Sequence, residues 1–595
     1  MDDTHNRRMG TALHEVARAS APAGRAGAAF RTALAWAPAL TVAAFALPIG
    51  AGLLGTVAPA FGFLPVIGGT SWSLEPWRAL FAYPGFNSSL ALSLVTAVLA
   101  TLGSIAIALG SCALLYGSRW GNRIGALVAP LLAMPHAALA IGFAFIILPS
   151  GWIARMVSPW LTGWSVPPDL LTVAHPSGVP IVVSLLMKEV PYLMLMTLGA
   201  LNQVPAREHT RIAQSLGYGR TAAWIKIVLP QVYPQIRLPV YAVLSFSLSV
   251  VDVALILGPS NPPTLAVLAV RWFVDPDTTR YFQAAAAAML LFGLVAAAIA
   301  VWFAGEKLVA RAARPWLEKG ARKTLAEPAA IFTTGLLAIL FAFAAATIVS
   351  LTLWSFAQAW RFPAALPPSL TLANWRVQGE SLVGPALTTL AVGSAATVLA
   401  LVLVVACLEH EAYLSARRSA RARGAQVLWL IYLPLLVPQV AFLFGTQVLL
   451  VRLGFDATFA AVIWAHLVFV LPYLFLSLAD PWRAFDPRYA RSALSLGSSP
   501  WRVLLRVKLP ILLRPLLIAC AVAFAVSVGQ YLPTLFAGSG RVATLTTEAV
   551  TLSAGADRRV IGTWALLQAV LPWAGYLLAA GVPAILYTRR RGLLA

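Results

Sequence analysis

The sequence predicts an all-α polytopic membrane protein with about twelve transmembrane helices, arranged as a tandem parallel repeat of six. Three observations support this fold class. Apolar residues make up 60% of the 595 positions and charged residues only 11%, whereas soluble domains average about 45–50% and about 25%. Many apolar runs are long enough to cross a bilayer. A polar motif also occurs twice, once in each half of the chain.

The apolar runs define the expected spans, since a transmembrane helix needs about 20 mostly apolar residues. They lie near 33–58, 88–116, 124–149, 181–201, 238–258, 282–304, 329–357, 385–408, 427–450, 459–479, 513–536 and 563–587. The first run is too long for the core of a signal peptide, so we expect an uncleaved first span. No soluble domain remains outside these runs.

The charge distribution indicates the orientation. The chain has 43 Lys and Arg against 21 Asp and Glu, a net charge of +22. In a membrane protein this excess is a topological signal rather than a sign of nucleic-acid binding, because short basic loops stay on the cytoplasmic side. Most of the basic residues fall on one side of the bilayer if the spans alternate from a cytoplasmic N-tail. We therefore expect both termini in the cytoplasm.

The repeated motif relates the two halves. Arg211 to Gly217, followed by Leu229-Pro230, recurs as Arg491 to Gly497, followed by Leu509-Pro510, with every position displaced by 280. Six spans separate the copies, so both motifs emerge on the same face, as in a parallel repeat about an axis along the membrane normal. The expected parts are the N-tail 1–32, the first half 33–304 with its motif loop 202–237, the basic linker 305–328, the second half 329–587 with its motif loop 480–514, and the C-tail 588–595.

Two further landmarks repeat in the third span of each half. Pro135 precedes Gly142 by seven residues, and Pro438 precedes Gly445 by seven residues. Proline inside a membrane helix is tolerated when neighbouring groups satisfy the backbone that it frees. Similar helices are therefore expected at both places.

Each motif loop has the pattern of two short helices with a flexible joint. In the first loop Ile212 and Leu216 share one helical face, Gly217 can end this helix, and a second amphipathic run stops at Pro230. Such a protrusion suits a groove in another protein. An amphipathic helix on the lipid surface is the alternative, but it does not explain the same residues at the same spacing in both halves.

These loops resemble the pattern E-A-A, three residues, G, nine residues, I, one residue, L-P of permease subunits of binding-protein-dependent ABC importers. The resemblance implies a type I importer fold in which each loop docks on one of two copies of an ATPase subunit, which would bind the ATP and Mg²⁺. It also implies a periplasmic or extracytoplasmic substrate-binding protein. Both copies carry Arg where the family usually has Glu. The implied coupling residues are Arg211, Ile212, Ala213, Gly217, Ile227, Leu229, Pro230, Arg491, Ser492, Ala493, Gly497, Val507, Leu509 and Pro510.

The resemblance extends to the fused permeases of Ynj-type uptake systems. It is carried by the stretch from Ser247 to Leu265 and by the stretch from Gln530 to Ala549. Relatives among the fused permeases carry thiamine or ferric iron. The resemblance thus implies a bacterial inner-membrane protein, surrounded by membrane lipid, that passes a thiamine-like or other small solute.

Polar residues inside spans are the candidates for the substrate pathway, because they are costly in a bilayer. Asp252 in the fifth span and Gln530 in the eleventh occupy matching places, and His136 and Gln439 follow the repeated prolines. Glu189 stands beside Lys188 near the expected outer interface. Mutual pairing and snorkelling of Lys188 and Glu189, hydrogen bonds between helices, and a salt bridge to Asp252 remain alternative structural roles.

The sequence favours a non-catalytic subunit without a metal or cofactor of its own. It contains no G-x-x-x-x-G-K-[ST] phosphate loop, so the driving energy must come from a partner or from an ion gradient. A twelve-helix secondary transporter is the second hypothesis, although the loop from Gly117 to Gly125 lacks the expected acid. A membrane-embedded enzyme is the third, but its outer acids and histidines have no catalytic spacing, and Cys112, Cys407 and Cys520 have no metal-ligand spacing.

Overall fold

A computed structural model of the chain describes residues 32, 34–119, 121–320, 322, 326–415 and 424–587. The regular structure in these ranges is helical, apart from two isolated β-bridges, which confirms the predicted all-α class. The N-tail up to residue 31, part of the linker, and the C-tail lie outside the described residues, and so does the basic stretch 416–423.

The described ranges contain nine helices that are long and apolar enough to cross a membrane, and two further bent pairs of helices. The bent pairs are Leu430–Leu436 with Gln439–Arg452, at 97°, and Pro500–Ile511 with Leu513–Val528, at 81°. The single helices are Leu34–Ala60, Phe86–Leu115, His136–Val157, Val179–Leu201, Arg280–Glu318, Glu327–Phe356, Ala373–Leu414, Phe459–Arg483 and Arg558–Leu586.

Two of the expected spans are interrupted within the first half. The run 124–149 is divided at Pro135 into α4 (Gly121–Ala133) and α5 (His136–Ile147). The run 238–258 is divided into α10 (Leu229–Ser249) and α11 (Asp252–Leu257). Pro135 is extended, with ψ of 147°, and its ring cannot supply the N–H that a continuous helix needs. The two predicted spans are therefore each made of two consecutive helices.

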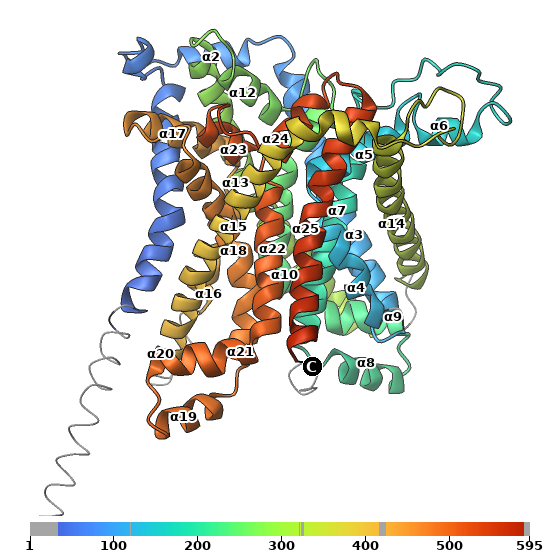
Figure 1. The fold of residues 1–595 in the computed structure, drawn as a ribbon. Coiled ribbons are helices and arrows are strands. Elements are labelled where there is room, and N and C mark those ends of the chain that lie inside the picture. Colours follow the sequence, from blue (N-terminus) through green and yellow to red (C-terminus); the bar gives the residue numbers. More distant parts are fainter. Residues whose placement is uncertain are drawn as a thin grey trace, which may run out of the picture.

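The helices run roughly in parallel between two ends of the molecule (Figure 1). The short helices α8 (Ala206–Ser215), α9 (Arg220–Ala223), α19 (Pro487–Ser495) and α20 (Pro500–Val503) lie at one end. The opposite end carries α2 (Glu75–Phe81), α6 (Trp152–Val157) and α12 (Leu265–Phe273). Both motif loops thus project from the same end, as the even number of intervening spans requires.

The first helix of the chain packs against the second half. At the crossing of Leu34–Ala60 with α17 (Gln439–Arg452), the Gly445 N–H donates to Thr56 Oγ1 at 3.1 Å and Thr446 Oγ1 donates to the Pro48 carbonyl at 3.1 Å. A Cβ on Gly445 would lie 2.0 Å from the carbonyl oxygen of Gly52. Only glycine lets the two backbones approach this closely.

The reciprocal contact occurs in the other direction. Helix α14 (Ala326–Phe356), the first helix of the second half, crosses α5 of the first half at Gly142. A Cβ on Gly142 would lie 2.3 Å from Thr347 Cγ2 and 3.0 Å from Leu351 Cγ. The two repeated glycines are therefore the points where each half receives the first helix of the other. This exchange ties the halves together.

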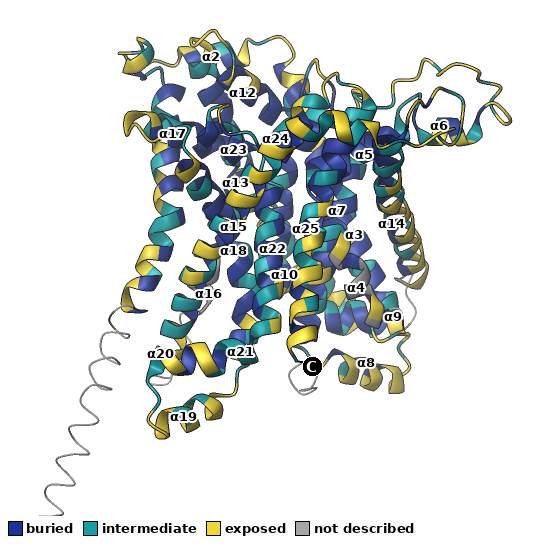
Figure 2. Cartoon of the chain, in the orientation of Figure 1, coloured by how far each residue is buried: buried dark blue, intermediate teal, exposed yellow. Residues whose placement is uncertain are grey.

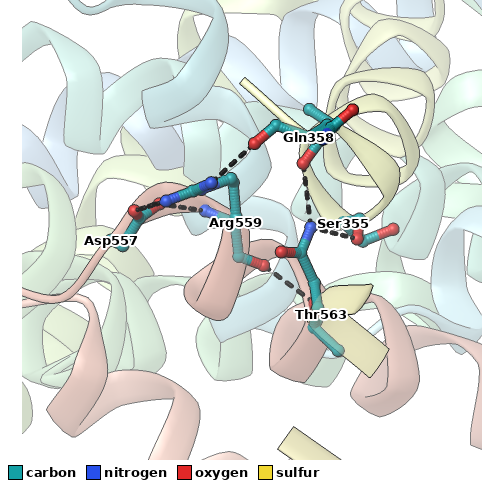
Figure 3. A network of polar contacts seen from close by, with 7 residues as sticks. Ser355, Gln358, Asp557, Arg559 and Thr563 are labelled. Atoms are coloured by element: carbon teal, nitrogen blue, oxygen red, sulfur yellow. Dashed lines mark hydrogen bonds and ion pairs between the residues drawn. The ribbon is translucent and has the colours of Figure 1, made fainter. Parts of the chain in front are cut away.

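A polar network also joins segments at the end opposite the motif loops (Figure 3). Asp557 accepts a hydrogen bond from Arg559 Nη2 at 2.6 Å, and Arg559 Nη1 donates to the Gln358 carbonyl at 2.6 Å. Thr563 Oγ1 donates to the Arg559 carbonyl at 2.8 Å. The network fixes the start of α25 (Arg558–Leu586) against the segment that follows α14.

The helix exchange predicts a position-specific effect of substitution. Gly445→Leu should destabilise the purified protein by about 1–3 kcal/mol or more, because the added side chain must displace backbone. Gly50→Leu is the matched control, since a Cβ on Gly50 meets nothing within 4 Å. The midpoint of thermal unfolding in detergent, followed by size-exclusion chromatography, measures the difference. Equal midpoints for the two variants would contradict the crossing at Gly445.

Candidate functional site

A cavity of about 260 Å³ lies between the two halves. Its walls come from both copies of the repeat, from α7 (Val179–Leu201) and α10 in the first half and from α18 (Phe459–Arg483) and α22 (Leu513–Val528) in the second. All five residues predicted from the sequence as pathway candidates line this one cavity. They are His136, Glu189, Asp252, Gln439 and Gln530.

Four interrupted helices surround the cavity. The breaks fall between α4 and α5, between α10 and α11, between α16 (Gly424–Leu436) and α17, and between α22 and α23 (Leu532–Gly538). His136, Asp252 and Gln439 are each the first residue after a break, and Gln530 lies within the fourth. Irregular backbone at membrane depth is tolerated where it is buried in protein or lines a cavity.

Lys188 stabilises the first of these breaks. Its Nζ donates to the carbonyls of Leu131, at 3.1 Å, and Leu132, at 2.7 Å, and also to that of Met134. These are carbonyls at the end of α4 that no longer have a helical partner. Lys188 lies in the interior of α7 and is buried. The ammonium of Lys188 is thus held by backbone carbonyls, which differs from the alternative role of snorkelling and pairing with Glu189.

The break in the second half is stabilised by a different side chain. Ser245 Oγ of α10 donates to the Leu436 carbonyl, at the end of α16, at 2.9 Å. The residue 280 positions after Ser245 is Ala525, which cannot donate. A cation from α7 thus performs for α4 what a hydroxyl from α10 performs for α16.

The acidic groups of the cavity lie near the histidine. Glu189 Oε1 is 3.6 Å from His136 Nε2, and the His136 ring lies 4.7 Å from the ring of Phe246. Asp252 is 9% exposed. The described residues contain no group of three or more His, Cys, Asp or Glu that could hold a metal ion. Tyrosine side chains complete the polar and aromatic lining: Tyr192, Tyr473, Tyr531 and Tyr576.

The two motif loops have the same sequence of elements. In the first, α8 ends before Gly217, with φ of +86°, and α9 continues into the π-helix η2 (Trp224–Val228) and α10. In the second, α19 ends before Gly497, with φ of +82°, and α20 continues into the π-helix η3 (Leu504–Lys508). Both glycines adopt the left-handed conformation that other residues rarely reach.

The outer faces of α8 and α19 are open to their surroundings (Figure 2). Leu216 is 58% exposed and Leu496 is 86% exposed, directly before the two glycines. The side chains of Arg211, Ile212, Arg491 and Ser492 are also exposed, whereas Ala213 is buried. Ala493 lies in α19 and is half-buried. The remaining predicted loop residues lie where each loop rejoins the membrane helices, in or beside the π-helices: Ile227 in η2, Val507 in η3, Leu229 and Pro230 in α10, and Leu509 and Pro510 in α21 (Leu509–Ile511).

Comparison with known proteins agrees with this architecture. Residues 100–306 match the family described as binding-protein-dependent transport system inner membrane component. The chain is 33% identical over 527 residues, 88% of its length and 93% of the relative's, to the inner membrane ABC transporter permease protein YnjC of Escherichia coli (strain K12). It is 38% identical over 143 residues, 21% of its length, to the molybdenum transport system permease protein ModB of Mycobacterium bovis, of which it covers 54%.

The relatives decide between the hypotheses that the sequence left open. They favour a permease powered through an ABC system over a secondary transporter driven by an ion gradient. Their descriptions also place such chains in the inner membrane, in keeping with the many apolar helices. This chain therefore belongs to the family of inner-membrane permease components of binding-protein-dependent ABC transport systems.

Proposed function

We propose that the cavity between the two halves is the substrate site of the importer and that the two motif loops receive two copies of a separate ATPase subunit. The observation that carries this proposal is the gathering of all five polar candidates around one cavity at the junction of the repeats. A binding protein would deliver the solute from the periplasmic side. The chain itself would bind no nucleotide, since ATP and Mg²⁺ would be held by the partner.

The helices offer a direct route from each loop to the cavity. Helix α10 begins at the end of the first π-helix and runs to Ser249, directly before the two-residue break that precedes Asp252. In the second half α21 follows the π-helix, and α22 continues from it after the 81° bend to Val528, two residues before Gln530. Each is a stiff rod of about 1.5 Å per residue, so a displacement of the loop moves the polar residues at its far end. Closure of the ATPase dimer would then switch the opening of the cavity from one side of the membrane to the other.

The charges of the cavity favour a small organic cation, of which thiamine is the proposed example. Glu189 and Asp252 bring two carboxylates to the lining, and the ammonium of Lys188, which also lines the cavity, is engaged by three carbonyls. The tyrosine rings can add cation–π attraction. The ligand of ModB, given by its name, is a property of that protein and is not transferred to this chain.

The orientation follows from the same assignment. The end that carries α8 and α19 would face the cytoplasm, because an ATPase must reach it and because basic loops are retained there. Both termini would lie on that side.

Docking on the loops predicts co-purification of the partner. From cells expressing the whole system, the unaltered permease in mild detergent should retain an ATP-binding subunit at about two copies per chain. Mass spectrometry and quantitative gel densitometry would measure this ratio. Leu216→Asp with Leu496→Asp should release most of the ATPase, because a carboxylate would have to be desolvated in the contact. Leu366→Asp, at a residue 60% exposed at the opposite end, is the control and should retain it. A permease that purifies alone would overturn the assignment.

A pathway role for Asp252 predicts a loss of transport without loss of assembly. Asp252→Asn should lower thiamine uptake into proteoliposomes containing the complete importer about tenfold or more, since a hydrogen bond to a charged group contributes about 1.5–3 kcal/mol. Asp277→Asn, at an exposed position in the outer segment, should transport normally. Unchanged uptake by Asp252→Asn would exclude this carboxylate from the pathway, and absence of thiamine uptake by the unaltered importer would reject thiamine as the cargo.

A further inference from the structure

A second cavity lies at the end of the molecule that carries the motif loops. It has a volume of about 210 Å³ and opens between the end of α3 (Phe86–Leu115) and the first motif loop. Helices α3 and α9 are in contact there, and Figure 1 shows α9 beside α4 and α8 below α9, at this end of the molecule. Three arginines dominate the lining together with the polar side chains of Thr210 and Gln214: Arg207, Arg211 and Arg220.

The three guanidinium groups are not neutralised by acids of the cavity, whose lining contains no Asp or Glu. Arg220 donates to the carbonyl of Tyr116, and the Arg207 guanidinium lies 5.9 Å from the Tyr116 ring centroid. Neither Arg207 nor Arg211 forms an ion pair with a residue in the described ranges. Guanidinium groups gathered in this way suit an anion with several acceptor oxygens, above all a phosphate.

The position of the cavity matches the headgroup layer of a bilayer. Tyr116 directly follows α3, a membrane-spanning helix, and its ring packs 5.9 Å from that of Trp224 in η2. Tyrosine and tryptophan are enriched at the boundary between lipid and water. Basic pockets between transmembrane helices on the cytoplasmic side bind acidic lipid headgroups.

The repeat shows that this cavity is not a general feature of the docking loops. In the second loop the residues 280 positions later retain only one of the three arginines, and neither polar side chain: Pro487, Ala490, Arg491, Leu494 and Pro500 stand for Arg207, Thr210, Arg211, Gln214 and Arg220. Two identical ATPase subunits, as proposed above, would present the same surface to both loops. A site that only one loop possesses is therefore not explained by ATPase docking.

We propose that this arginine-lined cavity binds the phosphate of an anionic phospholipid headgroup at the cytoplasmic surface. The shared chemistry is a phosphate ester or free phosphate held by Arg207, Arg211 and Arg220, with Thr210 and Gln214 as additional hydrogen-bonding groups. The site would anchor the first motif loop to the bilayer, while the second loop has no such anchor.

The test measures binding to the purified full-length permease in uncharged detergent, without the ATPase. Microscale thermophoresis would compare short-chain phosphatidylglycerol, short-chain phosphatidylcholine and inorganic phosphate at fixed ionic strength. We expect phosphatidylglycerol to bind more tightly than phosphatidylcholine. Arg207→Gln with Arg220→Gln should weaken this binding about 30-fold, because the variant removes the contributions of two basic side chains near an acidic headgroup.

The matched control removes two exposed arginines from the second loop, Arg488→Gln with Arg502→Gln. This variant loses the same charge from the same end and should keep its affinity. Tight binding of inorganic phosphate that is lost in the first variant would support the arginine site and identify the free anion as its ligand. Equal losses in the two variants, or equal affinity for the two lipids without phosphate binding, would overturn the proposal. Because no ATPase is present, either result is independent of the coupling assignment.

Discussion

The structure depends on how backbone carbonyls are satisfied where helices break inside the membrane. A bilayer core supplies no water for such groups, so each interruption requires an internal donor. Lys188 supplies three hydrogen bonds at the end of α4, and Ser245 supplies one at the end of α16. These two donors serve two of the four interruptions that surround the cavity. The central cavity exists because these interruptions leave polar side chains where continuous apolar helices would otherwise pack.

The same breaks connect the cavity to the two ends of the molecule. The segments beyond Pro135 and Pro438 receive the exchanged first helices at Gly142 and Gly445, which holds the outer part of each half against its neighbour. The segments before the other two breaks, α10 and α22, lead back to the motif loops. The segments beyond Pro135 and Pro438 are thus held by the other half, whereas α10 and α22 can move with the motif loops. Such an arrangement suits a protein that alternates between two access states.

Much of the fold could be predicted from the sequence because its signals are periodic or repeated. Apolar runs located the spans, and the displacement of 280 positions placed both loops on one face. The polar candidates could be singled out because each is costly in lipid, and in the structure all five line the central cavity. Interactions between distant segments left no comparable signal. Gly142 and Gly445 were noted for their spacing, but nothing local indicated which helix would cross them. The π-helices and the three bonds of Lys188 depend likewise on tertiary packing.

The two halves also differ in ways that a repeat alone would not suggest. Lys188 corresponds in function, but not in position, to Ser245. The first loop has an arginine-lined cavity, and in the second loop prolines stand at the positions of two of its three arginines. Fusion into a single chain permits such divergence, because each half always packs against the same other half. The asymmetry therefore concerns packing and surface contacts, whereas the elements of the loops and the breaks around the cavity remain shared.

In the proposed mechanism the ATPase moves the two loops toward one another and thereby changes the side of the membrane to which the cavity opens. Double electron–electron resonance on the assembled importer tests it most directly, with spin labels at Gln203→Cys and Ala484→Cys, two exposed positions just before α8 and α19, after replacement of the three native cysteines. The account predicts a shorter distance between the labels when the complex is trapped with ATP and vanadate than in its nucleotide-free state. An unchanged distance in an importer that still hydrolyses ATP would contradict it.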